Sequence, residues 1–205
     1  MQIIEGKDVD LIHPFPEKEL HRVFGWLHCY RTLADTTNFP KTPEEFTEKL
    51  KALPTIETYG IIDKNNILGV RHEAPLIGIY MFDRDTTLNG NAHVASTRKA
   101  WGSRLVDQAG QLLIGHVLDK HPEMTRVTVT VLASNAPAKA LCKRLGFTYE
   151  GCVRDAITVN GHPANMALFG LTRRDWIDLN LASVVIDPVP PGRPREYEAY
   201  EVSRG

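Results

Sequence analysis

The feature that most limits the fold is one long amphipathic stretch, Trp101–Leu118, with a strand-like segment on either side. The positions of this stretch that would face a core follow the 3.6-residue period of a helix: Leu105, Ala109, Leu112, Leu113, His116 and Val117. The segment before it, 91–97, follows an Asn-Gly turn, and the segment after it, 126–132, alternates branched residues as strands do. A long helix between two strands is typical of an α/β domain.

The remaining segments extend this pattern. Further strands are expected at 58–62, 76–82, 147–153 and 165–171, and helices at 17–27 and 42–50. The first fifty residues as a whole are predicted to be helical. A short helix is expected to begin at Asn135 as its N-cap and to end at Gly146, where glycine tolerates the left-handed conformation. The order predicts one α/β domain whose mixed sheet is flanked by helices.

Composition limits the domain count and the partners. With 205 residues, 42% of them hydrophobic, the chain can form one ordinary domain. We expect that domain at 1–178 and a proline-rich C-terminal tail at 179–205. A net charge of −1 does not favour nucleic acid or an anionic membrane. The sequence has neither an apolar run of the ~20 residues that a membrane span needs nor a signal peptide, so a cytoplasmic location is expected. Cys29, Cys142 and Cys152 are expected to be reduced thiols.

Two strand-to-helix junctions are candidate ligand sites. At the first, residues 97–104, the opening turn of a helix offers unpaired N–H groups and a partial positive charge. Gly102 allows close backbone approach, while Arg98, Lys99 and Arg104 add positive charge. These properties suit a pyrophosphate, although an ordinary solvated helix start explains them equally well.

The second junction begins at Ser134 and Asn135. Lys139 and Lys143 follow as neighbours on one helix face, so they could hold a phosphate or remain solvated. The capping role of Asn135 is by itself a sufficient explanation of that residue.

Together with three later motifs, the two junctions resemble the GNAT acetyltransferases, and most closely their RimJ/RimL-like branch. The matching residues run from about Leu76 to Trp176 in the family's order: Trp101-Gly102-Ser103-Arg104, Asn135 with Ala138, Leu145-Gly146-Phe147, Glu150-Gly151 with Arg154-Asp155, and Phe169-Gly170-Leu171 leading to Asp175-Trp176. No single motif is specific, but five in this order are.

The resemblance implies an N-acetyltransferase whose third strand and 126–132 strand splay apart to form a cleft for acyl-CoA. Acetyl-CoA is the expected donor, and no metal is expected. Backbone groups from Val94 to Ser96 would lie along the pantetheine. The other implied cofactor-binding residues surround the two helix starts: Lys99, Trp101, Gly102, Ser103, Arg104, Leu105, Val106, Asn135 and Lys139.

The resemblance also implies direct attack of an amine on the thioester. The position of the acid that protonates the leaving thiolate is occupied by Cys142, and Ser134 is the nearby substitute. For the general base, Glu73, Asp83, Asp85 and His93 stay open. The acceptor is expected to be a protein N-terminus or a small-molecule amine.

Alternatives remain at this stage. Arg104 replaces the second glycine of the family's phosphate loop and Ala138 replaces a serine, so a binding scaffold of the same fold without turnover is one alternative. A metal site at His21, His28 and Cys29 is another, but histidines seven residues apart do not have the usual ligand spacing. A homodimer, joined through the tail, stays open.

Overall fold

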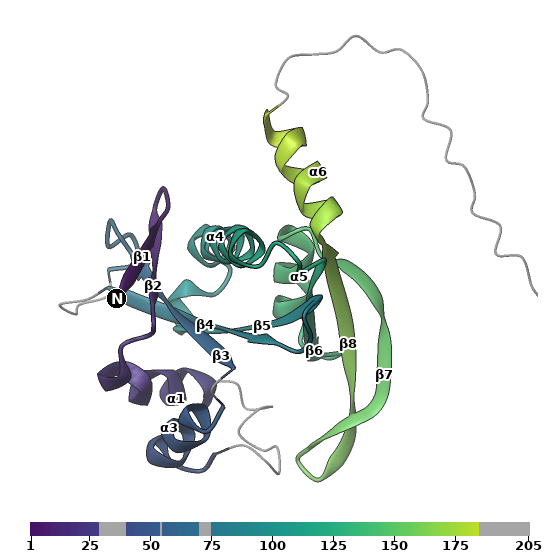
Figure 1. The fold of residues 1–205 in the computed structure, drawn as a ribbon. Coiled ribbons are helices and arrows are strands. Elements are labelled where there is room, and N and C mark those ends of the chain that lie inside the picture. The colour runs from purple at the N-terminus through teal and green to yellow at the C-terminus, as the bar shows by residue number, and fades with distance from the viewer. Residues whose placement is uncertain (29–39, 54, 70–74, 185–205) are drawn as a thin grey trace, which may run out of the picture.

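The computed structural model describes residues 1–28, 40–53, 55–69 and 75–184. Within these ranges eight strands form a single sheet in the order β1-β2-β3-β4-β5-β6-β8-β7 (Figure 1). The strands are β1 (Gln2–Glu5), β2 (Val9–His13), β3 (Ile56–Asp63), β4 (Leu76–Arg84), β5 (Asn89–Ser96), β6 (Arg126–Leu132), β7 (Thr148–Val159) and β8 (His162–Thr172). All neighbouring strands are antiparallel except β5 and β6, which are parallel.

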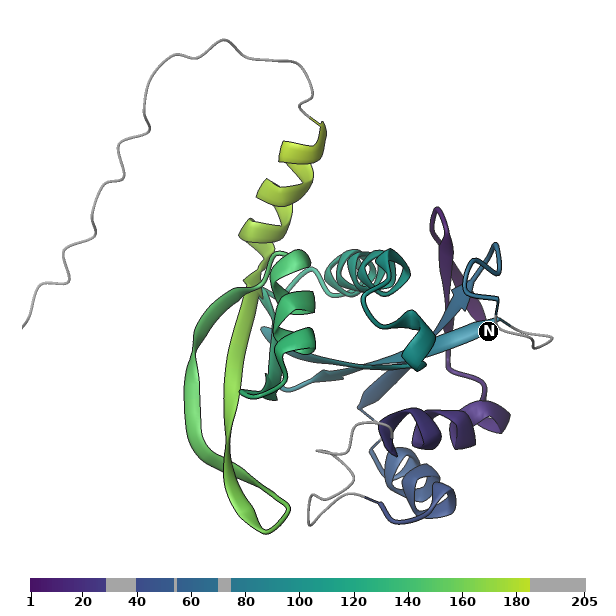
Figure 2. The same ribbon diagram turned by 180° about the vertical axis from the view of Figure 1, so that it is seen from behind.

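Helices cover both faces of the sheet, as Figures 1 and 2 show. On one face lie α4 (Arg104–Lys120) and α5 (Ala136–Arg144), and on the other lie α1 (Leu20–His28) and α3 (Pro43–Lys51). Each face has its own buried apolar cluster. The predicted α/β domain with a mixed, mostly antiparallel sheet is therefore confirmed.

The first fifty residues are not all helical, so that prediction was wrong. A β-hairpin of β1 and β2 precedes α1, and alternate residues of β2, Val9 and Leu11, are fully buried. They join the cluster beneath α4, against which β2 packs. A period of two over five residues is a weak signal in the sequence, and the packing of Val9 and Leu11 against α4 supplies the burial that stabilises the strand.

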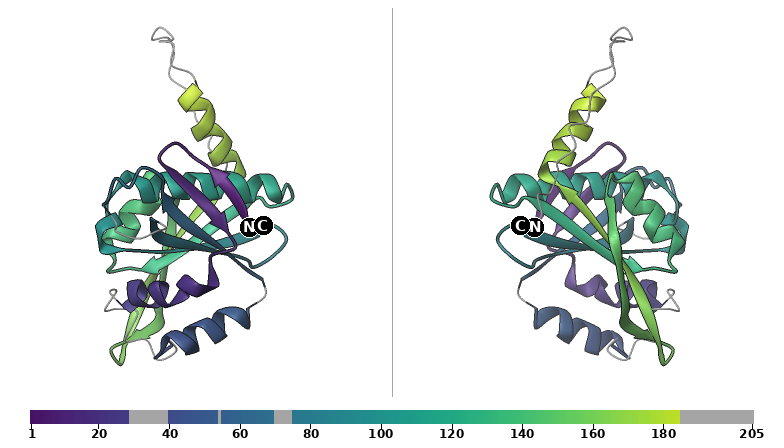
Figure 3. Two further views of the ribbon diagram at one scale, coloured as in Figure 1. Left: turned by 90° about the vertical axis from the view of Figure 1, so that its left-hand side faces the viewer. Right: turned by 90° about the vertical axis from the view of Figure 1, so that its right-hand side faces the viewer.

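A helix at the end of the domain was also missed. After β8 the chain continues into α6 (Arg173–Val184), which extends away from the sheet (Figure 3). Thr172 and Asp175 form a reciprocal cap, because Asp175 Oδ2 accepts from the Thr172 N–H at 3.0 Å and the Asp175 N–H donates to Thr172 Oγ1 at 3.1 Å. The division of the chain at residue 178 stays a prediction, and residues 185–205 lie outside the described ranges.

The long helix begins at Arg104 rather than at Trp101, because residues Arg98–Ala100 form a 3-10 turn first. Its first turn is fastened to the sheet by Tyr80 on β4, whose buried hydroxyl donates to the Val106 carbonyl oxygen at 3.1 Å. Gly110 allows this close approach, since a Cβ atom there would lie 2.7 Å from the Tyr80 oxygen. The start of α4 is therefore held at a defined height above β4.

Candidate functional site

The sheet opens between β5 and β6. These strands pair only at their first residues, from Asn89↔Arg126 to Asn91↔Thr128, and no further pairing joins them although both strands continue. We call this opening the fork. It is the splay that the sequence resemblance implied, and α4 and α5 lie over it on one face of the sheet (Figure 2).

Inside the fork, one edge of β5 has backbone groups without a strand partner. The Thr97 N–H donates to the Ile77 carbonyl of β4 at 2.9 Å. Since the direction of backbone hydrogen bonding alternates along an antiparallel strand, the N–H and C=O groups of Val94 and Ser96 point the other way, into the fork. An extended ligand could pair there as a strand does. The Ser96 carbonyl already accepts the Trp101 indole N–H at 3.3 Å.

The start of α4 lies next to the end of β5 and has the properties of an anion site. Gly102 has φ +73°, and a Cβ atom added to it would meet no atom within 4 Å, so space is open above this backbone. Ser103 occupies the N-cap position without capping any amide. The buried hydroxyls of Ser103 and Thr97 find no hydrogen-bond partner among the described residues. The N–H groups of the first helical turn point out of the helix end.

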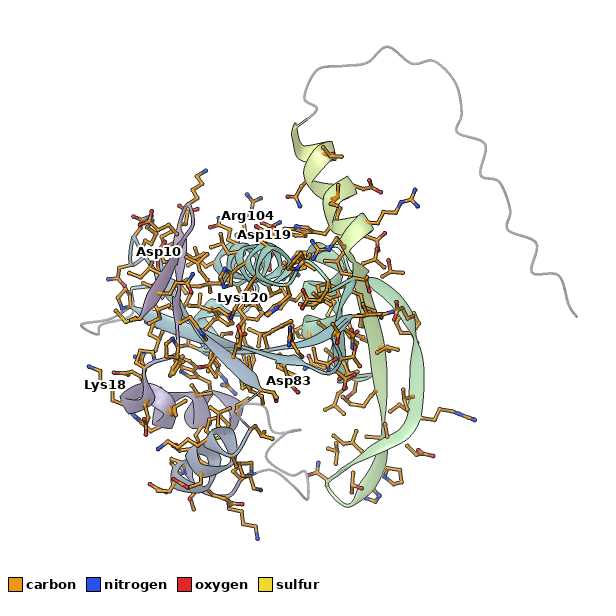
Figure 4. The ribbon with its side chains drawn as sticks, in the orientation of Figure 1. Asp10, Lys18, Asp83, Arg104, Asp119 and Lys120 are labelled. Atoms are coloured by element: carbon orange, nitrogen blue, oxygen red, sulfur yellow. The ribbon has the colours of Figure 1, made fainter. Side chains whose placement is uncertain are left out.

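The residues at this helix start fit a pyrophosphate. Leu105 and Val106 bury their side chains beneath α4, at 4% and 6% exposure, so they could contribute only backbone N–H groups. Arg104 is exposed and projects from α4 on the side away from the sheet (Figure 4), which leaves the end of the helix clear. Lys99 is also exposed, and its amine donates to the Gly69 carbonyl at 3.4 Å.

Sequence reasoning missed an ion pair that joins the two helices at this site. Arg144, at the end of α5, makes two hydrogen bonds to Asp107 in the first turn of α4, Nε to Oδ2 at 2.7 Å and Nη2 to Oδ1 at 3.0 Å. The hydrogen bond and charge of Asp107 raise the pKa of the guanidinium. Arg144 thus balances a negative charge that would otherwise face a bound phosphate. The two residues are 37 positions apart, and no local pattern connects them.

The N-cap predicted at the second junction is present. Asn135 caps α5 by accepting the Ala138 N–H at 3.1 Å. Lys139 is turned back onto its own loop, where its amine donates to the Ala133 carbonyl at 2.5 Å. Ser134 is exposed beside the end of β6. Of the two lysines considered for a phosphate, Lys143 is the exposed one.

Cys142 lies in the core beneath α5 and is 4% exposed. Burial raises the pKa of its thiol to about 11. Burial therefore leaves this thiol closed to solvent on the side of the fork. The role of Cys142 as a proton donor stays a prediction.

Two of the four candidates for the general base are neighbours on the face of the sheet opposite to α4. In the register of β4 and β5, Asp83 lies across from Asn91 and His93 lies across from Met81, so Asp83 and His93 are diagonal neighbours. Asp85 is exposed in the following turn, where Oδ2 accepts from Asn89 at 3.5 Å. Glu73 lies outside the described residues.

A sheet that opens beside the uncapped start of a helix is the arrangement of N-acetyltransferases with the GNAT fold. The model of one family, described as "Acetyltransferase (GNAT) domain", matches residues 41–168, more than half of the chain. The chain therefore belongs to the GNAT acetyltransferases.

Relatives of the RimJ/RimL-like branch are among the similar proteins. YdaF of Bacillus subtilis (strain 168), whose name proposes a ribosomal N-acetyltransferase, is 26% identical over 179 residues, covering 86% of this chain and 92% of YdaF. The ribosomal-protein-S5-alanine acetyltransferase of Vibrio fischeri superposes with a TM-score of 0.66 at 17% identity, over 86% of this chain and 99% of that one. RimL, the ribosomal L7/L12 α-N-protein acetyltransferase, solved with coenzyme A, superposes with a TM-score of 0.67 at 16% identity, over 83% of this chain and 98% of that one.

Two further features bear on alternatives raised by the sequence. Within the described ranges, no three His, Cys, Asp or Glu side chains are grouped as metal ligands would be, and Cys29 of the proposed metal set is outside these ranges. In the same part of the chain, no helix is long and apolar enough to cross a membrane.

Proposed function

We propose that this N-acetyltransferase moves the acetyl group of acetyl-CoA to a primary amine in a ternary complex, and that the amine is the N-terminus of a ribosomal protein. The observation that carries the donor half is the fork between β5 and β6 beside the uncapped start of α4. The names of YdaF, the S5-alanine acetyltransferase and RimL support the acceptor half. A cytoplasmic location goes with such an acceptor.

In this proposal the donor binds along three elements. The pyrophosphate lies on the N–H groups from Gly102 to Val106, with Arg104 and Lys99 supplying positive charge. The pantetheine pairs with the free edge of β5 at Val94 and Ser96. Asn135 and Lys139 border the donor at the start of α5, and Trp101 holds the turn between β5 and α4 through its bond to Ser96.

Transfer would proceed by direct attack of the neutral amine on the thioester carbonyl. Positioning of the two reactants supplies most of the rate gain, up to about 7–11 kcal/mol for well-aligned groups. A backbone N–H of β5 in the fork would polarise the carbonyl oxygen. The burial of Cys142 argues against a covalent acetyl-cysteine. Ser134 is exposed and is therefore the better-supported donor of the proton to the leaving thiolate.

Calorimetric titration with acetyl-CoA tests the donor half, with desulfo-CoA and ATP as control ligands. We expect micromolar binding that Arg104→Glu weakens, because an acidic side chain at the start of α4 repels the pyrophosphate. Absence of binding up to millimolar concentration would leave only the scaffold alternative. Peptides that carry ribosomal-protein N-termini, compared with the same peptides blocked at the α-amine and with small amines, test the acceptor half.

A further inference from the structure

Asp83 and His93 lie beside an apolar part of the sheet. On the α1 side of the sheet, their neighbours in β4 and β5 are Ile79, Met81 and Ala95, which pack against the α1 and α3 cluster. Figure 4 shows the Asp83 side chain pointing toward this side, away from α4. Its Oδ1 atom is buried and has no hydrogen-bond partner within the described residues. Burying a carboxylate oxygen without a partner is costly, so a role in the site would explain why it is there.

This face is where the thioester of a bound donor would emerge. The pyrophosphate site at the start of α4 lies on the α4 and α5 side of the sheet, and the fork edge of β5 lies in the sheet itself. A pantetheine that starts there and enters the fork passes between β5 and β6 and delivers its thioester toward the opposite face. His93 is two residues beyond Asn91, the last residue of β5 that pairs with β6, and so it lies beside the opening.

The environment of His93 combines solvent exposure with desolvation by nearby protein groups. The side chain is exposed to water, yet enough protein surrounds it that desolvation lowers its pKa below the usual value. The charge of Asp83 acts in the opposite direction and raises the pKa. A lowered pKa favours the neutral imidazole, which is the form that accepts a proton.

Two arginines on this side of the sheet are each paired with a carboxylate. Arg126 on β6 pairs with Glu150 on β7 at 2.5 Å. Arg22 on α1 pairs with Glu19 at 3.0 Å and donates to the Leu76 carbonyl at the far end of β4. The hydrogen bond from Arg22 lowers the pKa of the Glu19 carboxyl, which makes this carboxylate a weak base. His93 therefore stands out, among the described titratable groups on this face, as a neutral base open to an incoming amine.

We infer that His93 accepts a proton from the acceptor ammonium and that Asp83 stabilises the imidazolium that forms; this inference rests on the proposed function. The ammonium passes one proton to the imidazole and becomes a neutral amine. The amine lone pair then forms the C–N bond at the thioester carbonyl. The C–S bond breaks, and the second N–H proton leaves the adduct while the CoA thiolate takes up a proton. His93 returns its proton to water.

Transfer kinetics of the full-length protein test this inference, with acetyl-CoA and a peptide with a free α-amine as substrates. Loss of a general base lowers rates typically by 10²–10⁴-fold, so we expect His93→Gln to reduce kcat/KM by about 100-fold or more. Its affinity for acetyl-CoA in calorimetry should stay unchanged. In His93→Gly, added imidazole should restore part of the rate, whereas the same ionic strength of sodium chloride should not.

The pH dependence separates a base from a structural residue. Activity should fall on the acid side as His93 becomes protonated, and Asp83→Asn should move this limb to lower pH because it removes the charge that raises the pKa. His116→Gln is the matched control: burial lowers the pKa of this histidine too, but it lies on α4, on the other face of the sheet. This variant should keep the wild-type acid limb.

Three results would count against these assignments in different ways. Full transfer by His93→Gln, with normal acetyl-CoA binding, would overturn the inference alone. An acid limb that Asp83→Asn leaves in place, or moves to higher pH, would overturn the role of Asp83. Wild-type protein that neither binds acetyl-CoA nor transfers the acetyl group would overturn the proposed function and this inference with it.

Discussion

Replacement of Arg144 should weaken acetyl-CoA binding although, in the proposed complex, this residue does not touch the donor. Its guanidinium holds Asp107 in a two-bond ion pair in the first turn of α4. In Arg144→Gln the carboxylate of Asp107 keeps its charge and loses its counter-ion. The bound pyrophosphate would then meet an uncompensated negative charge at the end of the helix that should attract it.

The magnitude follows from the position of Asp107. It lies four residues after the N-cap Ser103, about 6 Å along the helix axis at 1.5 Å per residue. A phosphate just beyond the helix end is then roughly 8 Å away. Two unit charges at this distance repel by about 2 kcal/mol at an effective dielectric constant of 20, and physiological salt reduces this to about 1 kcal/mol. For two phosphates we expect about 1–2 kcal/mol, or a 5- to 30-fold weaker affinity.

Calorimetry on four proteins measures the effect: wild type, Arg144→Gln, Asp107→Asn and the double variant. Asp107→Asn should bind acetyl-CoA at least as tightly as wild type, and the double variant should bind within about threefold of it, since both charges are gone. Acetyl-pantetheine, which has no pyrophosphate, should bind all four equally. The ion pair is partly exposed, so its loss should cost at most about 1 kcal/mol of folding free energy.

Two results would refute this reasoning. If the double variant binds as weakly as Arg144→Gln, Arg144 acts by direct contact and not by neutralising Asp107. In 1 M salt the screening length is about 3 Å, so the affinity of Arg144→Gln for acetyl-CoA should approach that of wild type. If it does not, the effect is not electrostatic.

Five further substitutions test the remaining features. Gly102→Ala should cost about 1–2 kcal/mol of folding free energy because its φ is positive, lower the melting temperature by roughly 2–4 °C per kcal/mol, and weaken acetyl-CoA binding in calorimetry. Tyr80→Phe should cost about 1 kcal/mol in denaturant unfolding through the lost bond to α4. Ser134→Ala should lower the transfer rate, whereas Cys142→Ala should keep it, as steady-state assays would show; the reverse would restore the thiol as the acid. Burial lowers the pKa of His116, so the unfolded chain binds more protons than the folded one, and the free energy of unfolding falls as pH drops below about 6.5. His116→Gln should reduce the slope of this free energy against pH, measured by denaturant unfolding from pH 5 to 7.

Local signals in the sequence predicted much of the fold and part of the site. The capping role of Asn135 and the left-handed Gly146, with φ +87°, both depend on groups a few residues away along the chain. The amphipathic period placed α4 to within a few residues. Gly102 was predicted as a point of close backbone approach from a local signal too, because it is a glycine in the turn between a strand and a helix. Its φ is positive, as such a turn allows for glycine.

Other features depend on which elements become neighbours. The hairpin of β1 and β2 is stabilised by burial against α4, and no pattern within Gln2–His13 names that partner. The pairing of Arg144 with Asp107 and the diagonal placement of His93 and Asp83 follow from helix packing and strand register. Propensities, caps and periods act over a few residues and can be read from the chain. Charge balance, orphaned polar groups and the width of the fork are set by contacts between segments distant in sequence, and only the tertiary structure decides those.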